Sequence, residues 1–280
     1  MTISADAATA EELYYDPYSV ELNMNPYPVF ARIREEAPLY YNSKHDFYAL
    51  SRYDDVNRAV IDHETFISGR GALLEIIKSG MEIPPGTLIF EDPPIHNIHR
   101  NLLSRMFTPR KVHALEPQIR EFTARCLDPL VGTGRFDFVN DLGEQMPMRV
   151  IGMLLGIPEE HQRRVADHGE ATLQSEQVDL LATGEVFAEF LDYRTEHPSD
   201  DIMTDLLNVE FEDETGTVRR LRRDELLMYL TVVATAGAET TTRLIGWVGK
   251  TLAEHPDQRR EMAENPALIP QAVEEILRWE

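Results

Sequence analysis

Apolar residues recur three or four positions apart in most segments of this chain. Such spacing predicts helices that turn one face toward a core. The segments that carry it are residues 27–36, 54–61, 93–107, 116–130, 146–155, 162–173, 184–193 and 202–209. Asp92 is expected to cap the third of these helices, and Pro109 to end it near Phe107, because the residue before a proline disfavours helical geometry. Gly156 is expected to end the fifth.

Short extended stretches interrupt this helical pattern. Residues 39–41 and 47–50 flank the turn-forming residues 42–44, so they predict a β-hairpin. Residues 136–139 predict a further short strand. Residues 69–94 mix apolar side chains with glycine and proline, and an apolar loop of this length is expected to line the core or a pocket.

The organisation of the chain is that of one folded unit. The 280 residues contain no internal repeat and no convincing linker, and residues 212–217 are expected to form an ordinary loop. The prediction is therefore a single domain over residues 1–280, mainly α with a small β portion.

The longest helical segment, residues 224–255, has an unusual middle. Its first part, residues 226–236, is apolar on every face, which predicts burial all round. Gly237 and the β-branched run 240–242 then disfavour a helix. Glu239 adds a carboxylate beside the apolar stretch, where an unpaired charge is costly. Local rules that fail together in one place indicate a functional or strained site.

Two interpretations of this middle segment follow. In one, Gly237 permits close helix packing, and the threonines bond to carbonyls four residues earlier. In the other, the glycine leaves room for a small ligand, while the acid and the hydroxyl of Thr240 relay protons from solvent. The combination of the three residue types favours the second.

Composition restricts the partners and the compartment. The formal net charge of −22 repels phosphate backbones and anionic lipids, which argues against nucleic acid and a membrane anchor. Residues 1–16 lack the basic start and apolar run of a signal peptide. The longest apolar run, residues 226–238, is shorter than the roughly 20 residues that span a bilayer. The single cysteine, Cys126, fits a reducing compartment. We expect a cytoplasmic protein.

Three segments resemble motifs of the cytochrome P450 family. Residues 236–241, Ala-Gly-Ala-Glu-Thr-Thr, are similar to its oxygen-binding motif. Residues 275–278, Glu-Ile-Leu-Arg, resemble its Glu-x-x-Arg helix. Residues 92–96, Asp-Pro-Pro-Ile-His, followed by Arg100 and by Phe-Thr-Pro-Arg at 107–110, resemble the haem-contacting helix of its soluble bacterial members. The three segments also occur in the family's order.

The resemblance implies a fold, a cofactor and a reaction. The fold would be that of cytochrome P450, incomplete at the C-terminus, with haem b as cofactor. The reaction would be that of a haem-thiolate monooxygenase, which inserts one atom of O2 into a hydrophobic small organic substrate and takes electrons from a ferredoxin-type or flavin-linked redox partner. Cys126 is expected to be a small buried hydrophobe. The thiolate ligand of the iron is therefore expected beyond Glu280, with no metal ligand in this stretch.

The resemblance also assigns roles to individual residues. Glu239 and Thr240 would be catalytic and would bring the protons that split the O–O bond. The residues toward the cofactor would be His96, Arg100, Ala236, Gly237 and Thr240. Of these, His96 and Arg100 are four positions apart on one helix face, so both can point at the haem propionates.

Further roles concern the substrate and the scaffold. The substrate would contact Phe90, Val232, Thr235 and Ala236, with residues 71–90 as a lid. Ordinary core packing is the alternative for each of them. Glu275 and Arg278 would be structural residues in a buried network with an arginine farther along the chain.

Other interpretations stay open. One is a non-catalytic helical binding protein, or a remnant, that keeps the scaffold without normal haem ligation. Another is a metal-binding helical bundle, although the sequence has no Glu-x-x-His pair of the di-iron kind, and a site at His96 and His99 lacks a third ligand. A basic cluster is expected either to dock an acidic electron-transfer protein or to be scattered solvated charge. Its members are Arg100, Arg105, Arg110 and Lys111.

Overall fold

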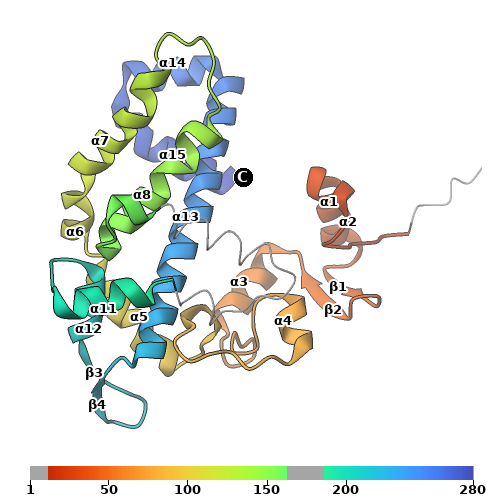
Figure 1. The fold of residues 1–280 in the computed structure, drawn as a ribbon. Helices are drawn as coiled ribbons and strands as arrows, with labels where there is room; N and C mark the ends of the chain where they lie inside the picture. Colours follow the sequence, from red (N-terminus) through yellow and green to blue (C-terminus); the bar gives the residue numbers. More distant parts are fainter. Residues whose placement is uncertain (1–11, 163–185, 280) are drawn as a thin grey trace, which may run out of the picture. The chain divides into compact units, whose positions relative to one another are not determined.

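The structure, a computed structural model, describes residues 12–162 and 186–279 (Figure 1). It divides into two compact units, Met1–Met81 and Glu82–Glu280. Within the described residues each unit consists mainly of helices, with one two-stranded antiparallel hairpin. The predicted fold class, mainly α with a small β portion, is confirmed. The single domain stays a prediction.

The smaller unit combines a hairpin with short helices. Its elements are α1 (Val20–Met24), α2 (Tyr27–Glu36), β1 (Leu39–Asn42), β2 (Phe47–Leu50), α3 (Tyr53–Ile61) and α4 (Leu74–Ser79). The helices predicted at residues 27–36 and 54–61 and the first hairpin are therefore confirmed. The ring of Tyr15 packs edge-on against Phe30, Tyr40 and Phe47, with centroids 5.9 to 6.0 Å apart.

The larger unit is arranged around one long helix, α13 (Arg223–Glu254), which agrees within one residue at each end with the prediction. Before it come η1 (Leu88–Phe90), α5 (Ile95–Met106), α6 (Pro109–Ala114), α7 (Glu116–Leu127), η2 (Asp128–Leu130), the π-helix η3 (Val139–Gly143), α8 (Gln145–Leu155), α11 (Ala188–Glu196), α12 (Ile202–Asn208), β3 (Glu210–Glu212) and β4 (Val218–Arg220). After it come α14 (Pro256–Glu264), η4 (Pro266–Leu268) and α15 (Ile269–Trp279). Helix α8 packs along α13 (Figure 1).

The core of the larger unit gathers on the first half of α13. Leu226, Tyr229, Leu230, Val233 and Ala234 of this helix are buried. They belong to one apolar cluster with side chains from α5, α8, α11 and α12. The predicted burial of this half is confirmed at these positions, whereas residues 227, 232 and 235 are half-buried and residue 236 is exposed. No helix of the described residues is both long and apolar enough to cross a membrane.

The strand predicted at residues 136–139 is wrong. Asp137 Oδ1 accepts hydrogen bonds from the backbone N–H groups of Val139 and Asn140, both at 3.0 Å. A side chain that binds the backbone two and three residues ahead competes with extended structure. The chain therefore turns at Asp137 and enters η3.

The start of α5 also differs from the prediction. Its N-cap residue is Pro94, with no side-chain cap, so the cap predicted at Asp92 is wrong. Helix α6 is not predicted from the sequence pattern. Pro109 ends one predicted helix, but proline also suits the first position of the next. The Thr108 side chain caps α6 by accepting a hydrogen bond from the N–H of Lys111 at 3.4 Å.

Three further boundaries differ. The loop predicted at residues 69–94 contains α4 and η1. The loop predicted at residues 212–217 is confirmed as the turn between β3 and β4, except that Glu212 belongs to β3. The helix predicted at residues 184–193 is described from Ala188 as α11. Beyond residue 162, the helix predicted at residues 162–173 lies outside the described residues.

Candidate functional site

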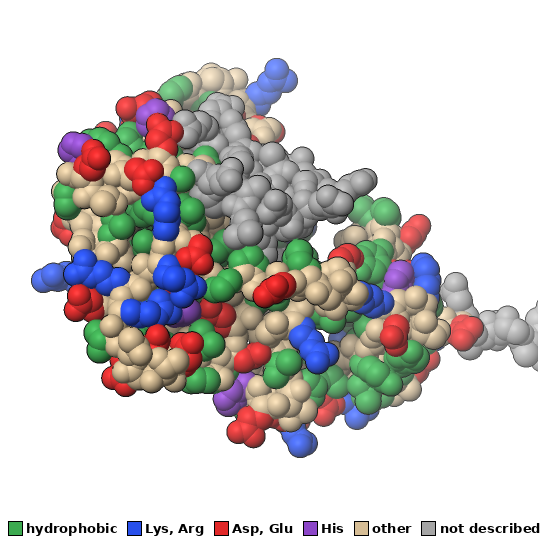
Figure 2. All heavy atoms as spheres, turned by 60° about the horizontal axis from the view of Figure 1, so that its bottom comes forward, with side chains coloured by type: hydrophobic (Ala, Val, Ile, Leu, Met, Phe, Trp, Pro, Cys, Tyr) green, Lys and Arg blue, Asp and Glu red, His purple; other side chains and the backbone are tan. Residues whose placement is uncertain are grey.

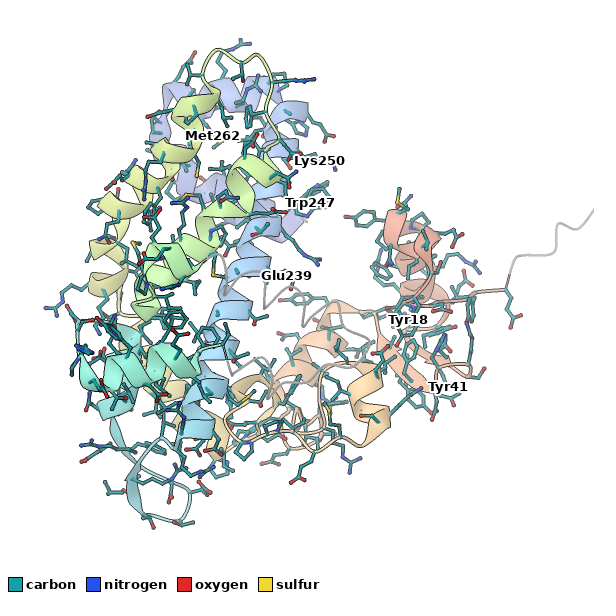
Figure 3. The ribbon with its side chains drawn as sticks, viewed as in Figure 1. Tyr18, Tyr41, Glu239, Trp247, Lys250 and Met262 are labelled. Atoms are coloured by element: carbon teal, nitrogen blue, oxygen red, sulfur yellow. The ribbon has the colours of Figure 1, made fainter. Side chains whose placement is uncertain are left out.

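The middle of α13 turns part of its surface away from the core. Ala236, Glu239 and Thr240 are exposed, whereas Val233 and Ala234, less than one turn earlier, are buried. Positions three and four apart share a face of a helix, so the three exposed side chains lie together. Figure 3 labels Glu239 on this helix. We call this set of three residues the open face of α13.

Two polar contacts order the open face. The Thr240 hydroxyl donates a hydrogen bond to the carbonyl oxygen of Ala236 at 2.8 Å. Arg243 donates one to Glu239 Oε1 at 2.6 Å. Thr231 and Thr195 make the same contact four residues back, each at 2.8 Å, so this bond alone does not mark a site. Thr240 differs because it stands on an exposed face beside an acid.

Gly237 faces α8 rather than the open face. A Cβ at this position would lie 2.3 Å from Ile151 Cδ1 on α8. The space that the sequence suggested for a ligand beside Gly237 is therefore filled by Ile151, and for this residue the close-packing interpretation describes the structure. The role of Gly237 toward a cofactor stays a prediction. On the open face, the small exposed residue is Ala236 rather than Gly237.

Helix α5 presents a second group of polar side chains. His96 is half-buried and Arg100 is exposed, and their spacing places them on one face. Among the residues that the structure describes, neither side chain has a hydrogen-bond or ion-pair partner. Both therefore keep their donors for an anion, and the guanidinium can bind a carboxylate with two parallel bonds.

These residues fit the cofactor that the sequence implies. Haem b combines a flat apolar ring with two propionates. The ring suits the small side chains of Ala236 and Thr240, and the propionates suit His96 and Arg100, whose side chains have no partner among the described residues. Within residues 12–162 and 186–279, no group of three or more His, Cys, Asp or Glu side chains could hold a metal ion. The metal-binding bundle therefore gains no support from the described part of the chain.

The residues predicted to contact substrate have mixed surroundings. Val232 and Thr235 are half-buried, within two turns before Thr240, and Phe90 is buried in η1. Of the predicted lid, residues 71–81 belong to the smaller unit and residues 82–90 to the larger. The contact of these residues with a substrate stays a prediction.

Glu275 and Arg278 pair on α15. The guanidinium donates two hydrogen bonds to the carboxylate, at 2.7 and 2.8 Å. Those bonds lower the pKa of the Glu275 carboxyl below its usual value. Their side chains are 61% and 64% exposed, so within the described residues the pair lies on the surface rather than in a buried network. Its structural role stays a prediction.

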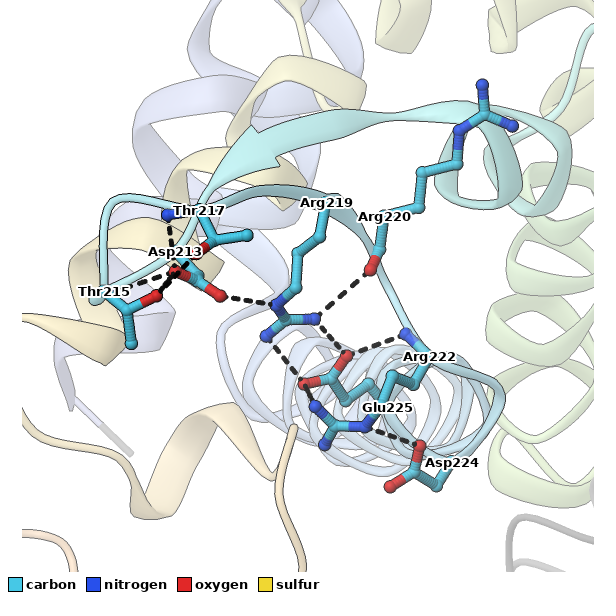
Figure 4. Close-up of polar contacts among 8 residues, drawn as sticks. All are labelled: Asp213, Thr215, Thr217, Arg219, Arg220, Arg222, Asp224 and Glu225. Atoms are coloured by element: carbon cyan, nitrogen blue, oxygen red, sulfur yellow. Dashed lines mark hydrogen bonds and ion pairs between the residues drawn. The ribbon is translucent and has the colours of Figure 1, made fainter.

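A network of ion pairs that the sequence does not predict holds the start of α13 (Figure 4). Glu225 is only 2% exposed and accepts hydrogen bonds from Arg219 at 2.8 and 3.1 Å and from the N–H of Arg222 at 2.8 Å. Asp213, in the turn before β4, holds Arg219 from the other side at 3.0 Å. Burial raises the pKa of Glu225, but these bonds outweigh burial and hold it below its usual value. The only signal in the sequence was an acid in the first helical turn.

A second buried pair was also missed. Nδ1 of His99 lies 2.8 and 2.9 Å from the carboxylate oxygens of Glu91. His99 had been considered only as a metal ligand with His96. Its position on the apolar stripe that includes Leu102 and Met106 was the available signal, because a histidine on a core face needs a polar partner.

Comparisons with known proteins identify the relatives of this chain. No protein-family model matches the chain. It is 32% identical over 272 residues to Cytochrome P450 130 of Mycobacterium tuberculosis, covering 91% of this chain and 66% of that protein. It is 34% identical over 274 residues to the vitamin D(3) 25-hydroxylase of Pseudonocardia autotrophica, covering 95% and 67%. The chain thus spans about two thirds of the length of these relatives.

A solved structure shares the fold. Cytochrome P450 CYP109Q5 from Chondromyces apiculatus superimposes with a TM-score of 0.78 and 32% identity, covering 93% of this chain and 66% of that one. Sequence and structure comparisons therefore lead to the same group of bacterial proteins.

Proposed function

Since the chain belongs to the cytochrome P450 family, we propose that the protein containing it is a haem-thiolate monooxygenase. Proteins of this family depend on haem b, which is the cofactor expected from the sequence. The proposed reaction inserts one atom of O2 into a hydrophobic small organic molecule. The observation that carries the proposal is the open face of α13, where Glu239 and Thr240 are exposed beside the small side chain of Ala236.

Bound haem would supply an iron that activates O2. The chain's part is to deliver protons and to hold the ligand. Because the Thr240 hydroxyl donates its hydrogen to the carbonyl of Ala236, its oxygen keeps lone pairs that accept a hydrogen bond from water or from a protonated ligand. Glu239 lies one residue earlier, in contact with solvent, and would pass protons inward from bulk water. His96 and Arg100 would hold the propionates.

The proposed electron donor is a ferredoxin-type or flavin-linked protein with an acidic surface. Of the basic cluster, Lys111 is committed to Asp205 at 2.5 Å. Arg105 and Arg110 are exposed and have no ion-pair partner among the described residues. Figure 2 shows basic and acidic side chains mixed on the face it presents. Docking would therefore depend on these arginines individually.

Neither the thiolate ligand nor the substrate is observed among the described residues. The thiolate ligand stays a prediction. The single cysteine of the sequence, Cys126, is half-buried on α7 and was not predicted to be that ligand. The substrate is expected to be hydrophobic, and a vitamin D(3) 25-hydroxylase among the relatives supports oxygenation of an organic molecule. The cytoplasmic location also stays a prediction.

The test is optical spectroscopy of the purified full-length protein. We expect a haem-loaded preparation whose reduced carbon monoxide complex has the Soret band of a thiolate ligand. A colourless protein that takes up no added haem would contradict the proposal and favour the alternative, a non-catalytic helical binding protein.

A further inference from the structure

A buried histidine–carboxylate pair ties α5 to the loop before it and to α13. The side chains of His99 and Glu91 are 4% and 13% exposed. Besides His99, the Glu91 carboxylate accepts a hydrogen bond from the N–H of Gly86 at 3.2 Å. Gly86 lies so close to α13 that a Cβ there would be 3.1 Å from the Cα of Glu225. The pair thus joins three segments of the larger unit.

The surroundings of the pair are apolar. The rings of Tyr229 on α13 and Phe211 on β3 meet the His99 imidazole edge-on, with centroids 5.5 and 6.0 Å away. The Tyr229 hydroxyl is buried without a hydrogen-bond partner among the described residues, so it does not bind Glu91 or His99. A hydrogen-bonded polar pair in such a place often stabilises a protein no more than well-packed apolar side chains would. Its distinctive property is direction, because hydrogen bonds weaken steeply when misaligned.

Direction matters here because of what stands next to His99. Successive residues of an α-helix are about 100° apart around its axis. Holding His99 toward Glu91 therefore fixes the direction of Arg100, one residue later, and of His96, three residues earlier. The other core contacts of α5, through Leu102 and Met106, are apolar and non-directional, so they resist rotation of the helix less well.

We propose that His99 is a positioning residue, whose bond to Glu91 holds α5 in the rotation that presents His96 and Arg100 to the propionates of haem b. This inference rests on the proposed function, because it takes haem as the ligand. His99 itself, buried against Tyr229 and Phe211, acts through its neighbours on the helix.

The test measures haem loss from the full-length haem-loaded protein to excess apomyoglobin. The double variant Glu91→Leu with His99→Leu removes both polar side chains, so neither is left buried without its partner. We expect a modest fall in its melting temperature, because the N–H of Gly86 loses its acceptor, and we expect its haem loss to accelerate about tenfold, as is typical when a residue that orients a ligand is changed. His99→Asn, whose amide nitrogen replaces Nδ1 as donor to Glu91, should restore slow haem loss.

Coupling to Arg100 makes the test specific. Arg100→Gln alone should accelerate haem loss, and adding the two leucine substitutions should cause little further change, because both act on the same contact. The inference is overturned if the double leucine variant loses haem at the wild-type rate. It is also overturned if the fold-increase in the rate of haem loss multiplies with that of Arg100→Gln. A wild-type protein that binds no haem instead overturns the proposed function, and this inference with it.

Discussion

Ile151 of α8 occupies the space beside Gly237 of α13, where a Cβ would lie 2.3 Å from Ile151 Cδ1. Gly237→Ala should therefore force the Ile151 side chain to move within the packed core between the two helices. We expect the free energy of unfolding to fall by about 1–3 kcal/mol, as for other overpacked cores. Urea unfolding measures it.

Gly246 is the matched control for this prediction. It lies on the same helix, but a Cβ there would meet Val139 Cγ2 at 3.5 Å, an ordinary contact. Gly246→Ala should stabilise the protein by up to about 1 kcal/mol through its higher helix propensity. Equal effects of the two substitutions would show that Ile151 yields easily and that the helices are not closely packed at Gly237.

Breaking the network around Glu225 at the start of α13 should strongly destabilise the protein. Glu225→Ala leaves Arg219 largely buried without its main partner, so we expect a loss of roughly 3 kcal/mol in the free energy of unfolding. The control is Glu210→Ala in the hairpin of β3 and β4, to which Arg219 also belongs. Its pair with Arg220 is solvent-exposed and should contribute less than about 1 kcal/mol. Similar losses in both variants would contradict the special role of Glu225.

Low pH should destabilise the hairpin of β3 and β4, whose turn contains Asp213. Hydrogen bonds from Thr215, Thr217 and Arg219 lower the pKa of Asp213 from 3.8 to about 2. A carboxyl whose pKa is lower in the folded state stabilises it fully above the unfolded value, and this contribution is lost as the pH falls from about 4 toward 2. Asp213→Asn should reduce the slope of unfolding free energy against pH in that window. An unchanged slope would mean that Asp213 titrates alike in both states.

Thr240 should matter for turnover if the proposed function holds. Thr240→Ala removes the hydroxyl of the open face, and product formation should fall about 10²- to 10⁴-fold, the usual contribution of positioned proton transfer. Thr195→Ala is the control, because Thr195 makes the same backbone contact on α11. Its turnover should match that of the wild type. Equal activity of all three proteins would remove Thr240 from the reaction.

Electron delivery can be tested through single charges. Arg110→Glu should slow reduction by an acidic donor and make the rate less sensitive to salt, because a favourable charge contact is lost. Arg135→Glu is the control. It makes the same change in net charge at an exposed arginine outside the basic cluster. Stopped-flow reduction at several ionic strengths measures both, and identical rates would favour scattered solvated charge.

The spacing of apolar residues predicted the helices because a helix that buries one face needs apolar residues three or four positions apart. The segment that became α13 was located within one residue at each end for this reason. The strand predicted at residues 136–139 failed because the side chain of Asp137 decided the local geometry. Residue period carries no information about such a contact.

The site was predictable in kind but not in orientation. A glycine, an acid and a hydroxyl in one apolar helix indicated a special segment, but only packing shows that Ile151 fills the space at Gly237. The pairing of His99 with Glu91 was similarly inaccessible. The two residues are eight positions apart, and the path of the chain between them determines whether they meet.

The two halves of α13 separate stability from the proposed chemistry. The first half is buried in the core and held at Glu225, whereas the residues of the open face are exposed. If the proposed function holds, substitutions at Ala236 or Glu239 should alter activity while the scaffold keeps its stability. This separation makes the open face a surface on which new specificities can evolve at little risk to folding.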